Sequence, residues 1–252
     1  MTRLELPSRR SIGSELAQLL DDQIAALKLT GRDTSIVDAL QDKRSATLKK
    51  ALNILKTKYA GDNLNLLSLA ERGIHIVIPV IPRTYCDANS QVTMVRCPKT
   101  KGRTEMGNNS KDRFTPDNVA HIIRTPQRPY YIFDVEDGRE MLGERPEDVI
   151  DMIKKCSGRR GLTEVETIAL GTHSDVLQHR GINAIGSCFR VQPRKRSSDN
   201  AIGSCPRERE RHHNLRAVFA LCLDEGRPQL RGNFLDCGFP HWGFPSCQAR
   251  IS

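Results

Sequence analysis

One stretch of the chain, residues 128–138 with the sequence RPYYIFDVEDG, constrains the fold more than any other. Its second residue is a proline, β-branched and aromatic residues follow, and it ends in an Asp-Gly dipeptide that favours a tight turn. This pattern predicts a buried strand over residues 129–136. The end of the strand carries three carboxylates into the turn, those of Asp134, Glu136 and Asp137.

The sequence before this strand predicts a helical N-terminal region, which we place at residues 1–62. Apolar residues recur at three-to-four spacing over residues 12–29 and again over residues 36–59, as they do on the buried face of a helix. The middle of the second segment, residues 41–47, is polar enough for a break. The remainder, residues 63–252, is expected to form an α+β domain.

Further strands surround the central one in the predicted fold. A nearly continuous apolar run over residues 74–81 is typical of a strand covered on both faces, and Pro79 places it at an edge, at a bulge or at the strand's end. A weak alternation over residues 91–96 predicts a partner strand, and residues 215–235 predict a hairpin. We therefore expect an α+β fold, in which a small mixed or antiparallel sheet has helices packed on one face.

Two helices are predicted after the central strand. Pro146 suits the first turn of a helix, and the apolar residues that follow it give a short amphipathic helix that ends near Gly158. Thr163 and Glu166 have the spacing of a capping box, in which each side chain accepts a hydrogen bond from the other residue's backbone N–H. This spacing predicts the start of the second helix.

The net charge of +9 is concentrated in two segments. Residues 95–113 contain six Lys or Arg against two acids, and residues 186–216 contain eight against three, so the rest of the chain is formally neutral. We interpret the two segments as basic surface loops near 97–117 and 186–214. Charge localised in this way favours contact with an anionic partner.

The second basic segment could bind the phosphates of a nucleic acid. The candidate contacts are Arg194, Lys195, Arg196, Arg207, Arg209 and Arg211. Stacking aromatics are missing apart from Phe189, and acids alternate with the last three arginines, so a solvated loop is the alternative. The segment also contains a repeat, because NAIGSC at 183–188 recurs at 200–205, which we interpret as a small local duplication.

The sequence excludes several classes of protein. No run approaches the roughly 18 apolar residues of a membrane-spanning helix, and residues 1–13 lack the apolar core of a signal peptide. We therefore expect a cytoplasmic protein whose eight cysteines are reduced thiols. The motifs of phosphate loops, dinucleotide-binding turns, zinc-protease helices and nucleophile elbows are absent, which disfavours chemistry by those routes.

The acidic end of the central strand is the first candidate site. Asp134 and Glu136 are two residues apart and are expected on one face of the strand with Tyr130 and Ile132, whereas Asp137 points the other way. Two carboxylates side by side can hold a divalent cation or divide into a general acid and a general base. The alternative is that they form only the polar exit of a buried strand.

The C-terminal segment carries a second set of candidates. The zinc ligand types there are Cys237, His241 and Cys247, with Cys222, His212 and His213 as further partners. The paired Cys-x2-Cys knuckles of structural zinc sites are absent, so scattered thiols are the alternative. Cys247 could instead act as a nucleophile assisted by His173 or His241.

Trp242, the only tryptophan, lies in a segment rich in glycine, proline and aromatic residues at 238–245. Such a loop could stack a flat ligand, and we take Trp242 and Arg250 as candidate ligand-binding residues. The commoner alternative for a tryptophan in this setting is a plug over the hydrophobic core.

Several of these patterns together carry a resemblance to a protein family. They are PYYIFDVEDG at 129–138, RPED at 145–148, LTEVETIALGTH at 162–173, the strand near 74–82 and the terminal pattern WGxxSCxxR. The chain thereby resembles, over about residues 63–252, a family of uncharacterised bacterial proteins, a domain of unknown function. The resemblance implies a bacterial cytoplasmic protein and assigns no activity and no catalytic residue. The arginine-rich insert between the two NAIGSC copies departs from it.

Three functions remain open at this point. The first, which we prefer, is a binding or non-catalytic bacterial protein with an unknown ligand. The second is a metal-dependent or thiol-using enzyme that employs Asp134 and Glu136 or the C-terminal Cys and His residues, with zinc or another divalent cation as its cofactor. The third is a basic nucleic-acid-associated protein.

Overall fold

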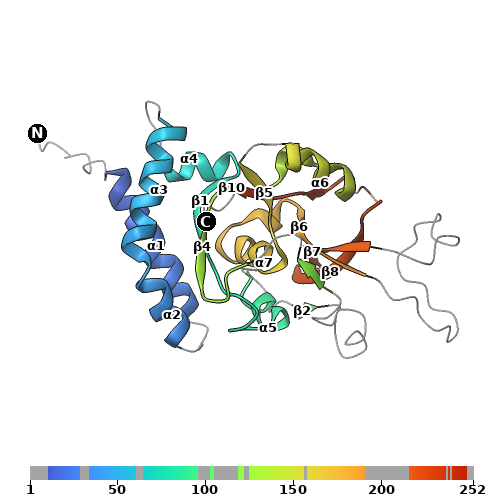
Figure 1. Cartoon of the computed structure of the whole chain (residues 1–252), viewed down its shortest axis with the longest axis horizontal. Helices are drawn as coiled ribbons and strands as arrows, with labels where there is room; N and C mark the ends of the chain where they lie inside the picture. The colour runs from blue at the N-terminus through green and yellow to red at the C-terminus, as the bar shows by residue number, and fades with distance from the viewer. Residues whose placement is uncertain are drawn as a thin grey trace, which may run out of the picture.

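The computed structural model describes residues 11–28, 34–60, 65–95, 103–104, 119–121, 125–155, 158–190, 216–236, 238 and 240–248. Its elements confirm the predicted α+β class with a helical N-terminal region (Figure 1). In chain order they are α1 (Ile12–Lys28), α2 (Thr34–Gln41), α3 (Arg44–Lys58), α4 (Leu66–Glu71), β1 (Ile74–Val80), α5 (Ala88–Val92), β2 (Arg103–Thr104), β3 (Val119–His121), β4 (Tyr130–Glu136), η2 (Arg139–Met141), α6 (Pro146–Lys155), β5 (Arg159–Gly161), α7 (Glu164–His173), η3 (Val176–Gln178), β6 (Gly181–Arg190), β7 (Arg216–Asp224), β8 (Arg227–Phe234), β9 (Trp242–Gly243) and β10 (Ser246–Gln248).

The N-terminal helices pack against the sheet that contains the central strand. The second predicted helix is interrupted between α2 and α3, at the polar segment where a break was expected. Apolar side chains of α1 to α4 form one hydrophobic cluster with Ile76 and Val77 of β1 and Tyr131 of β4. The Gln23 side-chain amide of α1 also donates to the Val77 carbonyl oxygen at 3.1 Å. The helices are therefore joined to the sheet by a shared core and by a buried hydrogen bond.

The strands divide between two sheets. The first has the order β1-β4-β10-β5, so β4 lies inside it and β1, which contains Pro79, lies at its edge. The second has the order β2-β8-β7-β6-β3, with β9 paired to β6. Its β7–β8 hairpin, in register from Ala217↔Phe234 to Asp224↔Arg227, confirms the hairpin predicted from the sequence.

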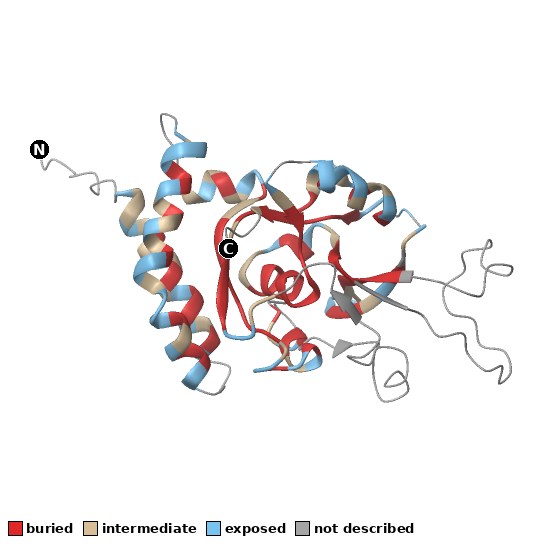
Figure 2. Ribbon diagram, viewed as in Figure 1, coloured by how far each residue is buried: buried red, intermediate tan, exposed pale blue. Residues whose placement is uncertain are grey.

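Helix α7 lies between the two sheets and is buried from Glu164 to Thr172 (Figures 1 and 2). Its apolar residues share a core with Tyr130 and Ile132 of the first sheet and with Phe219 and Leu221 of the second. The first sheet therefore has helices on both faces, the N-terminal helices on one and α7 on the other. The helix begins at the predicted capping box, where the Glu166 side chain accepts the Thr163 backbone N–H at 2.9 Å.

Two predictions for individual segments are wrong. Of the strand expected over residues 91–96, the described residues 91–95 form instead the end of α5 and a turn, and Asp87 caps that helix by accepting the Ser90 N–H. The Gln91 side chain points inward and donates to the carbonyl oxygens of Ile81 and Cys86. The alternation of residue types in this segment therefore reflects the buried face of a short helix rather than a strand.

The basic loop expected over residues 186–214 begins later than predicted. Residues 186–190 belong to β6, which also contains the first NAIGSC copy, at 183–188. Glycine is required within that copy because a Cβ at Gly186 would lie 2.8 Å from the Gly161 carbonyl oxygen. The second copy, and residues 191–214 as a whole, lie outside the described residues.

Candidate functional site

The end of β4 has an irregular backbone that redirects its side chains. Asp134 adopts a left-handed conformation, with φ of 52°, in the interior of the strand. Tyr130 and Ile132 face α7, as does Val135 beyond the irregularity, whereas Phe133 packs with the N-terminal helices. The sequence-based prediction that Asp134 shares a face with Tyr130 and Ile132 is therefore wrong, since a regular alternation does not pass through a left-handed residue. Such a conformation is costly for a non-glycine residue and persists only where surrounding contacts enforce it.

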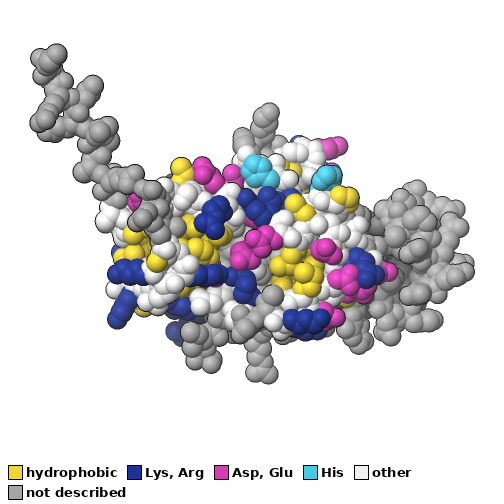
Figure 3. Space-filling view, turned by 90° about the horizontal axis from the view of Figure 1, so that it is seen from above, with side chains coloured by type: hydrophobic (Ala, Val, Ile, Leu, Met, Phe, Trp, Pro, Cys, Tyr) yellow, Lys and Arg dark blue, Asp and Glu magenta, His cyan; other side chains and the backbone are white. Residues whose placement is uncertain are grey.

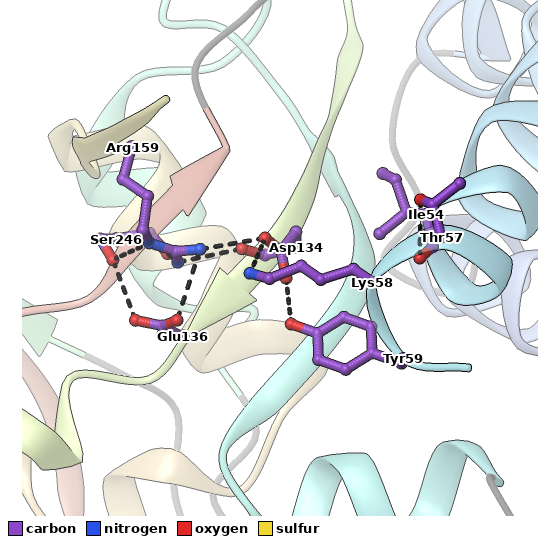
Figure 4. Close-up of polar contacts among 8 residues, drawn as sticks. All are labelled: Ile54, Thr57, Lys58, Tyr59, Asp134, Glu136, Arg159 and Ser246. Carbon is purple, nitrogen blue, oxygen red and sulfur yellow. Dashed lines mark hydrogen bonds and ion pairs between the residues drawn. The ribbon is translucent and has the colours of Figure 1, made fainter. Parts of the chain in front are cut away.

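Those contacts come from three side chains that converge on the Asp134 carboxylate (Figure 4). Lys58, the last residue of α3, donates to Oδ2 at 2.7 Å, and the Tyr59 hydroxyl donates to Oδ1. Arg159 of β5 donates to Oδ2 at 3.0 Å and, through its other terminal nitrogen, to the Asp134 carbonyl oxygen at 3.1 Å. Asp134 is only 3 % exposed. It joins the N-terminal helices to two strands of the first sheet.

Burial and the hydrogen bond to Asp134 raise the pKa of the Tyr59 phenol well above its usual value. Tyr59 therefore remains a hydrogen-bond donor to the carboxylate at neutral pH. The phenolate that a general base would need is disfavoured there.

Glu136 shares Arg159 with Asp134 but is held much more loosely. Its Oε1 lies 3.4 Å from Arg159 Nη1, and its Oε2 lies 3.4 Å from the Ser246 hydroxyl. Its side chain is 29 % exposed. Glu136 is thus a carboxylate at the rim of the sheet, with room to accept another partner.

Asp137, the next residue, is buried and saturated by arginines. The Arg139 side chain donates to Oδ2 at 2.8 Å, and Arg180 donates to Oδ1 at 3.1 Å. The remaining terminal nitrogen of Arg139 donates to the Glu71 carbonyl oxygen at 2.6 Å, which ties the strand end to α4. Asp137 is therefore held in place by two arginines at the end of β4.

The predicted Asp-Gly turn is confirmed, and two glycines make it fit. Gly138 has a left-handed φ of 84°, and a Cβ there would lie 2.3 Å from the Phe244 backbone nitrogen. Gly73, which faces it across the turn, has a φ of 77°, and a Cβ there would lie 2.4 Å from Arg139 Nε. Side chains larger than hydrogen at either position would displace the arginine or the C-terminal segment.

A pocket of about 80 Å³ opens at this strand end, between the end of α4 and η2. It is lined by Arg72, Gly73, Ile74 and the segment from Glu136 to Met141. Basic and acidic side chains lie among one another on the face viewed from above, towards which β4 ends (Figures 1 and 3). His75 lies next to this region, and burial lowers its pKa although Asp137 opposes the shift. The lining of the pocket is therefore largely charged.

A second group of buried charges surrounds α7. Glu166 accepts two hydrogen bonds from Arg160, each at 2.7 Å, and one from the Tyr130 hydroxyl at 2.9 Å. Glu164 is also fully buried and is paired through Oε2 with Arg83, but its Oε1 has no hydrogen-bond partner among the described residues. Burial raises the pKa of Glu164, and the pairing with Arg83 opposes that shift.

The model of the Family of unknown function (DUF5701) matches residues 20–205. The chain belongs to this family. The match begins within α1 and covers α2 to α4, β4 and α7, and so extends the similarity further towards the N-terminus than the sequence patterns indicated. The terminal WGxxSCxxR pattern lies outside it. No curated protein and no solved structure matches the chain.

Within this member of the family, the structure separates the predicted site residues. Asp134 and Glu136 share Arg159, as described above. His173 is the last residue of α7, Cys247 is fully buried in the α7 core, and His241 is exposed in a turn. The described residues contain no group of three His, Cys, Asp or Glu side chains arranged for a metal ion. The roles of Cys247 and His173 in catalysis stay predictions.

The remaining candidates are packed or lie outside the described residues. Trp242 is buried against Gly181, whose Cβ would lie 2.7 Å from the indole ring, and Arg231 lies over that ring at 4.8 Å. This packing is what a plug over the core requires. Outside the described residues lie Cys237, Arg250, His212, His213 and the six basic residues Arg194, Lys195, Arg196, Arg207, Arg209 and Arg211.

Two further observations bear on the sequence-based expectations. The described cysteines Cys86, Cys222 and Cys247 are buried thiols without a disulfide. Within the described part of the chain, no helix has the length and apolar character needed to cross a membrane.

Sequence reasoning missed the residues that complete the site. Lys58 and Tyr59 lie at the end of a predicted helix, 76 and 75 residues before Asp134, and Arg159 lies 25 residues after it. Each is an ordinary charged or aromatic residue in its local segment. Only the tertiary packing of α3 and β5 against β4 brings them together.

Proposed function

We propose that this protein is a bacterial cytoplasmic binding protein whose ligand site is the pocket at the end of β4. The ligand is small, since the volume of about 80 Å³ is close to that of two or three water molecules. It is polar, since most of the lining residues are charged. This extends the family assignment, which by itself supplies no ligand.

The observation that carries this proposal is the contrast between the base of the pocket and its rim. At the base, Asp137 and Arg139 line the pocket, and the Asp137 carboxylate is held by Arg139 and by Arg180 from outside the lining. At the rim, Glu136 is held only at 3.4 Å, and the Arg72 side chain has no hydrogen bond or ion pair with a described residue. A rigid base beneath loosely held charges is a favourable arrangement for binding, because little order has to be created on association.

Binding is favoured over acid–base catalysis by the state of Asp134. A pair of carboxylates that divides into acid and base needs both groups accessible to a substrate. Asp134 is enclosed by Lys58, Arg159 and Tyr59 and is buried, which leaves Glu136 as the one accessible carboxylate of the pair.

The test is a screen of small polar metabolites against the full chain by ligand-observed NMR, followed by titration of every hit. A ligand of this pocket should bind the wild-type chain and lose about tenfold or more in affinity in Glu136→Gln and in Arg72→Gln, roughly 1.4 kcal/mol each. Lys154→Gln on α6 is the matched control, since that side chain is exposed and paired only with Asp151. Hits that bind all three variants equally, or the absence of any hit, would contradict the proposal.

A further inference from the structure

We infer that the ligand of the β4 pocket is a small zwitterion, a free α-amino acid, bound through its ammonium and carboxylate groups. This inference rests on the proposed function and adds the chemical class of the ligand. It follows from which charged groups around the pocket are already satisfied and which are not.

The groups at the base cannot select a ligand by charge. Asp137 accepts hydrogen bonds from Arg139 and Arg180, and Arg139 uses its remaining terminal nitrogen on the Glu71 carbonyl oxygen. A ligand that competed for any of these would have to break a short, partly buried ion pair. Removing one partner from such a pair is costly, so the base is expected to stay as it is.

The groups that remain carry both signs. Arg72 and Glu140 line the pocket, and neither side chain has a hydrogen bond or ion pair with another described residue. Glu136 has only two long contacts, each at 3.4 Å, to Arg159 and Ser246. The available lining therefore consists of one guanidinium and two carboxylates.

A ligand with a single charge matches only part of this lining. A simple cation would pair with Glu136 or Glu140 but would meet the like charge of Arg72, and a simple anion would pair with Arg72 while approaching two carboxylates. Like charges brought together in a partly dehydrated site are repulsive, and such repulsion rejects the wrong ligand. A zwitterion places its carboxylate at Arg72 and its ammonium group at the glutamates, so every charge is opposed by its complement.

The size of the pocket also favours a small zwitterion. About 80 Å³ accommodates the ammonium, the α-carbon and the carboxylate of an amino acid but not a nucleotide or a sugar. Because the pocket is lined by exposed residues such as Arg72 and Glu140, a side chain on the α-carbon can project outwards into solvent. Selection is therefore expected to act on the charged end of the ligand.

The inference is tested by three probes of matched size, titrated into the full chain by isothermal calorimetry or by NMR of the protein. They are L-alanine, propionate, which lacks the ammonium group, and ethylamine, which lacks the carboxylate. L-alanine should bind about tenfold or more tightly than either mono-ion, which corresponds to roughly 1.4 kcal/mol for the missing charge.

Two charge variants should change the ligand preference of the pocket in opposite directions, Arg72→Gln towards ethylamine and Glu136→Gln towards propionate. Arg72→Gln should weaken L-alanine but not ethylamine, whereas Glu136→Gln should weaken L-alanine but not propionate. Both residues are at the surface or rim, so the fold should be retained, which is checked by the melting temperature. Lys154→Gln should leave all three affinities unchanged.

The outcomes separate this inference from the proposed function. If a mono-ion binds as tightly as L-alanine and the pocket variants weaken it, the function stands and the zwitterion is overturned. The same conclusion follows if no probe binds while another metabolite from the screen binds and responds to the variants. If L-alanine binds but ignores both variants, or if no small molecule binds at all, the site and the ligand class are overturned together.

Discussion

Asp134 and Glu136 lie two residues apart on one strand and share the same arginine, yet they differ in almost every other respect. Asp134 is 3 % exposed and holds Lys58, Tyr59 and both terminal nitrogens of Arg159 through its carboxylate and carbonyl oxygens. Glu136 is 29 % exposed at its side chain and is held by two contacts at 3.4 Å. One carboxylate joins three parts of the fold, and the other is available at the rim of a pocket.

The difference arises from the surroundings of each carboxylate and from the backbone between them. The left-handed conformation of Asp134 keeps its side chain beneath the end of α3, where Lys58 and Tyr59 can reach it. Two residues later, the Glu136 side chain is held by Arg159 of β5 and Ser246 of β10, each at 3.4 Å. Two carboxylates on one strand therefore have different surroundings: Asp134 fastens α3 and β5 to β4, a set of contacts we call the clamp, whereas Glu136 is partly exposed and loosely held.

The largest expected effect tests whether the clamp is structural. Asp134→Ala should lower the free energy of unfolding by about 3–5 kcal/mol, because it removes the buried partner of the largely buried Arg159 and of the half-exposed Lys58. Glu136→Ala should cost no more than about 1 kcal/mol, as for an exposed ion pair. Both values are measured by urea-induced unfolding of the full chain.

Asp134→Asn is the control that separates charge from backbone strain in this experiment. Asparagine tolerates a left-handed φ better than alanine does, so Asp134→Asn should destabilise the fold less than Asp134→Ala. Equal costs for the Asp134 and Glu136 alanine variants would mean that the two carboxylates play equivalent roles, and the contrast drawn above would be wrong.

The sequence predicted the elements of this region better than their connections. The apolar run before the Asp-Gly turn correctly predicts β4, and the Thr163–Glu166 spacing correctly predicts the start of α7, since both depend on neighbouring residues. The division into two sheets was not predicted, because strand pairing depends on contacts between distant segments. The short alternation at 91–96 misled for a related reason: a buried Gln91 in a short helix imitates the period of a strand.

The candidate site shows the same limit. The two carboxylates were identified from their position at a strand end, and one of them, Glu136, lines a pocket there. Their inequality depends on one backbone angle at Asp134 and on Lys58, Tyr59 and Arg159, none of which the local sequence connects to it. A local pattern of residue types and spacing predicts neither that backbone angle nor those distant contacts.

A parallel contrast within α7 sharpens the comparison. Glu166 has every oxygen engaged by Arg160, Tyr130 or the Thr163 N–H, whereas Glu164 has one oxygen on Arg83 and the other without a partner among the described residues. Burial raises the pKa of Glu164 above its ordinary value of 4.5. The folded state therefore holds the Glu164 proton more tightly than the unfolded state does.

It follows that Glu164 should make stability fall as the pH rises. Below the unfolded pKa, near 4.5, the carboxyl is protonated in both states and imposes no penalty. Between that value and the raised folded pKa, the folded state binds more protons, so the free energy of unfolding decreases with increasing pH. Glu164→Gln should remove this part of the slope, measured by urea unfolding from acid to neutral pH with Glu166→Gln in parallel. An unchanged slope would show that Arg83 fully compensates the burial.

The smallest effects concern the two side chains with which α3 reaches Asp134. Tyr59→Phe removes a hydrogen bond to a buried charge and should cost about 1.5–3 kcal/mol, whereas Lys58→Gln removes an ion pair whose lysine is half exposed and should cost about 1 kcal/mol or less. Because Lys58 is open to solvent, its contribution should also diminish as salt is added, while that of Tyr59 should not. The measurement is urea unfolding of both variants at low and high ionic strength. If Lys58→Gln proved the more damaging change and its effect did not depend on salt, the ion pair with Lys58 would dominate the clamp. The left-handed backbone of Asp134 would then depend on the lysine rather than on the Tyr59 hydroxyl.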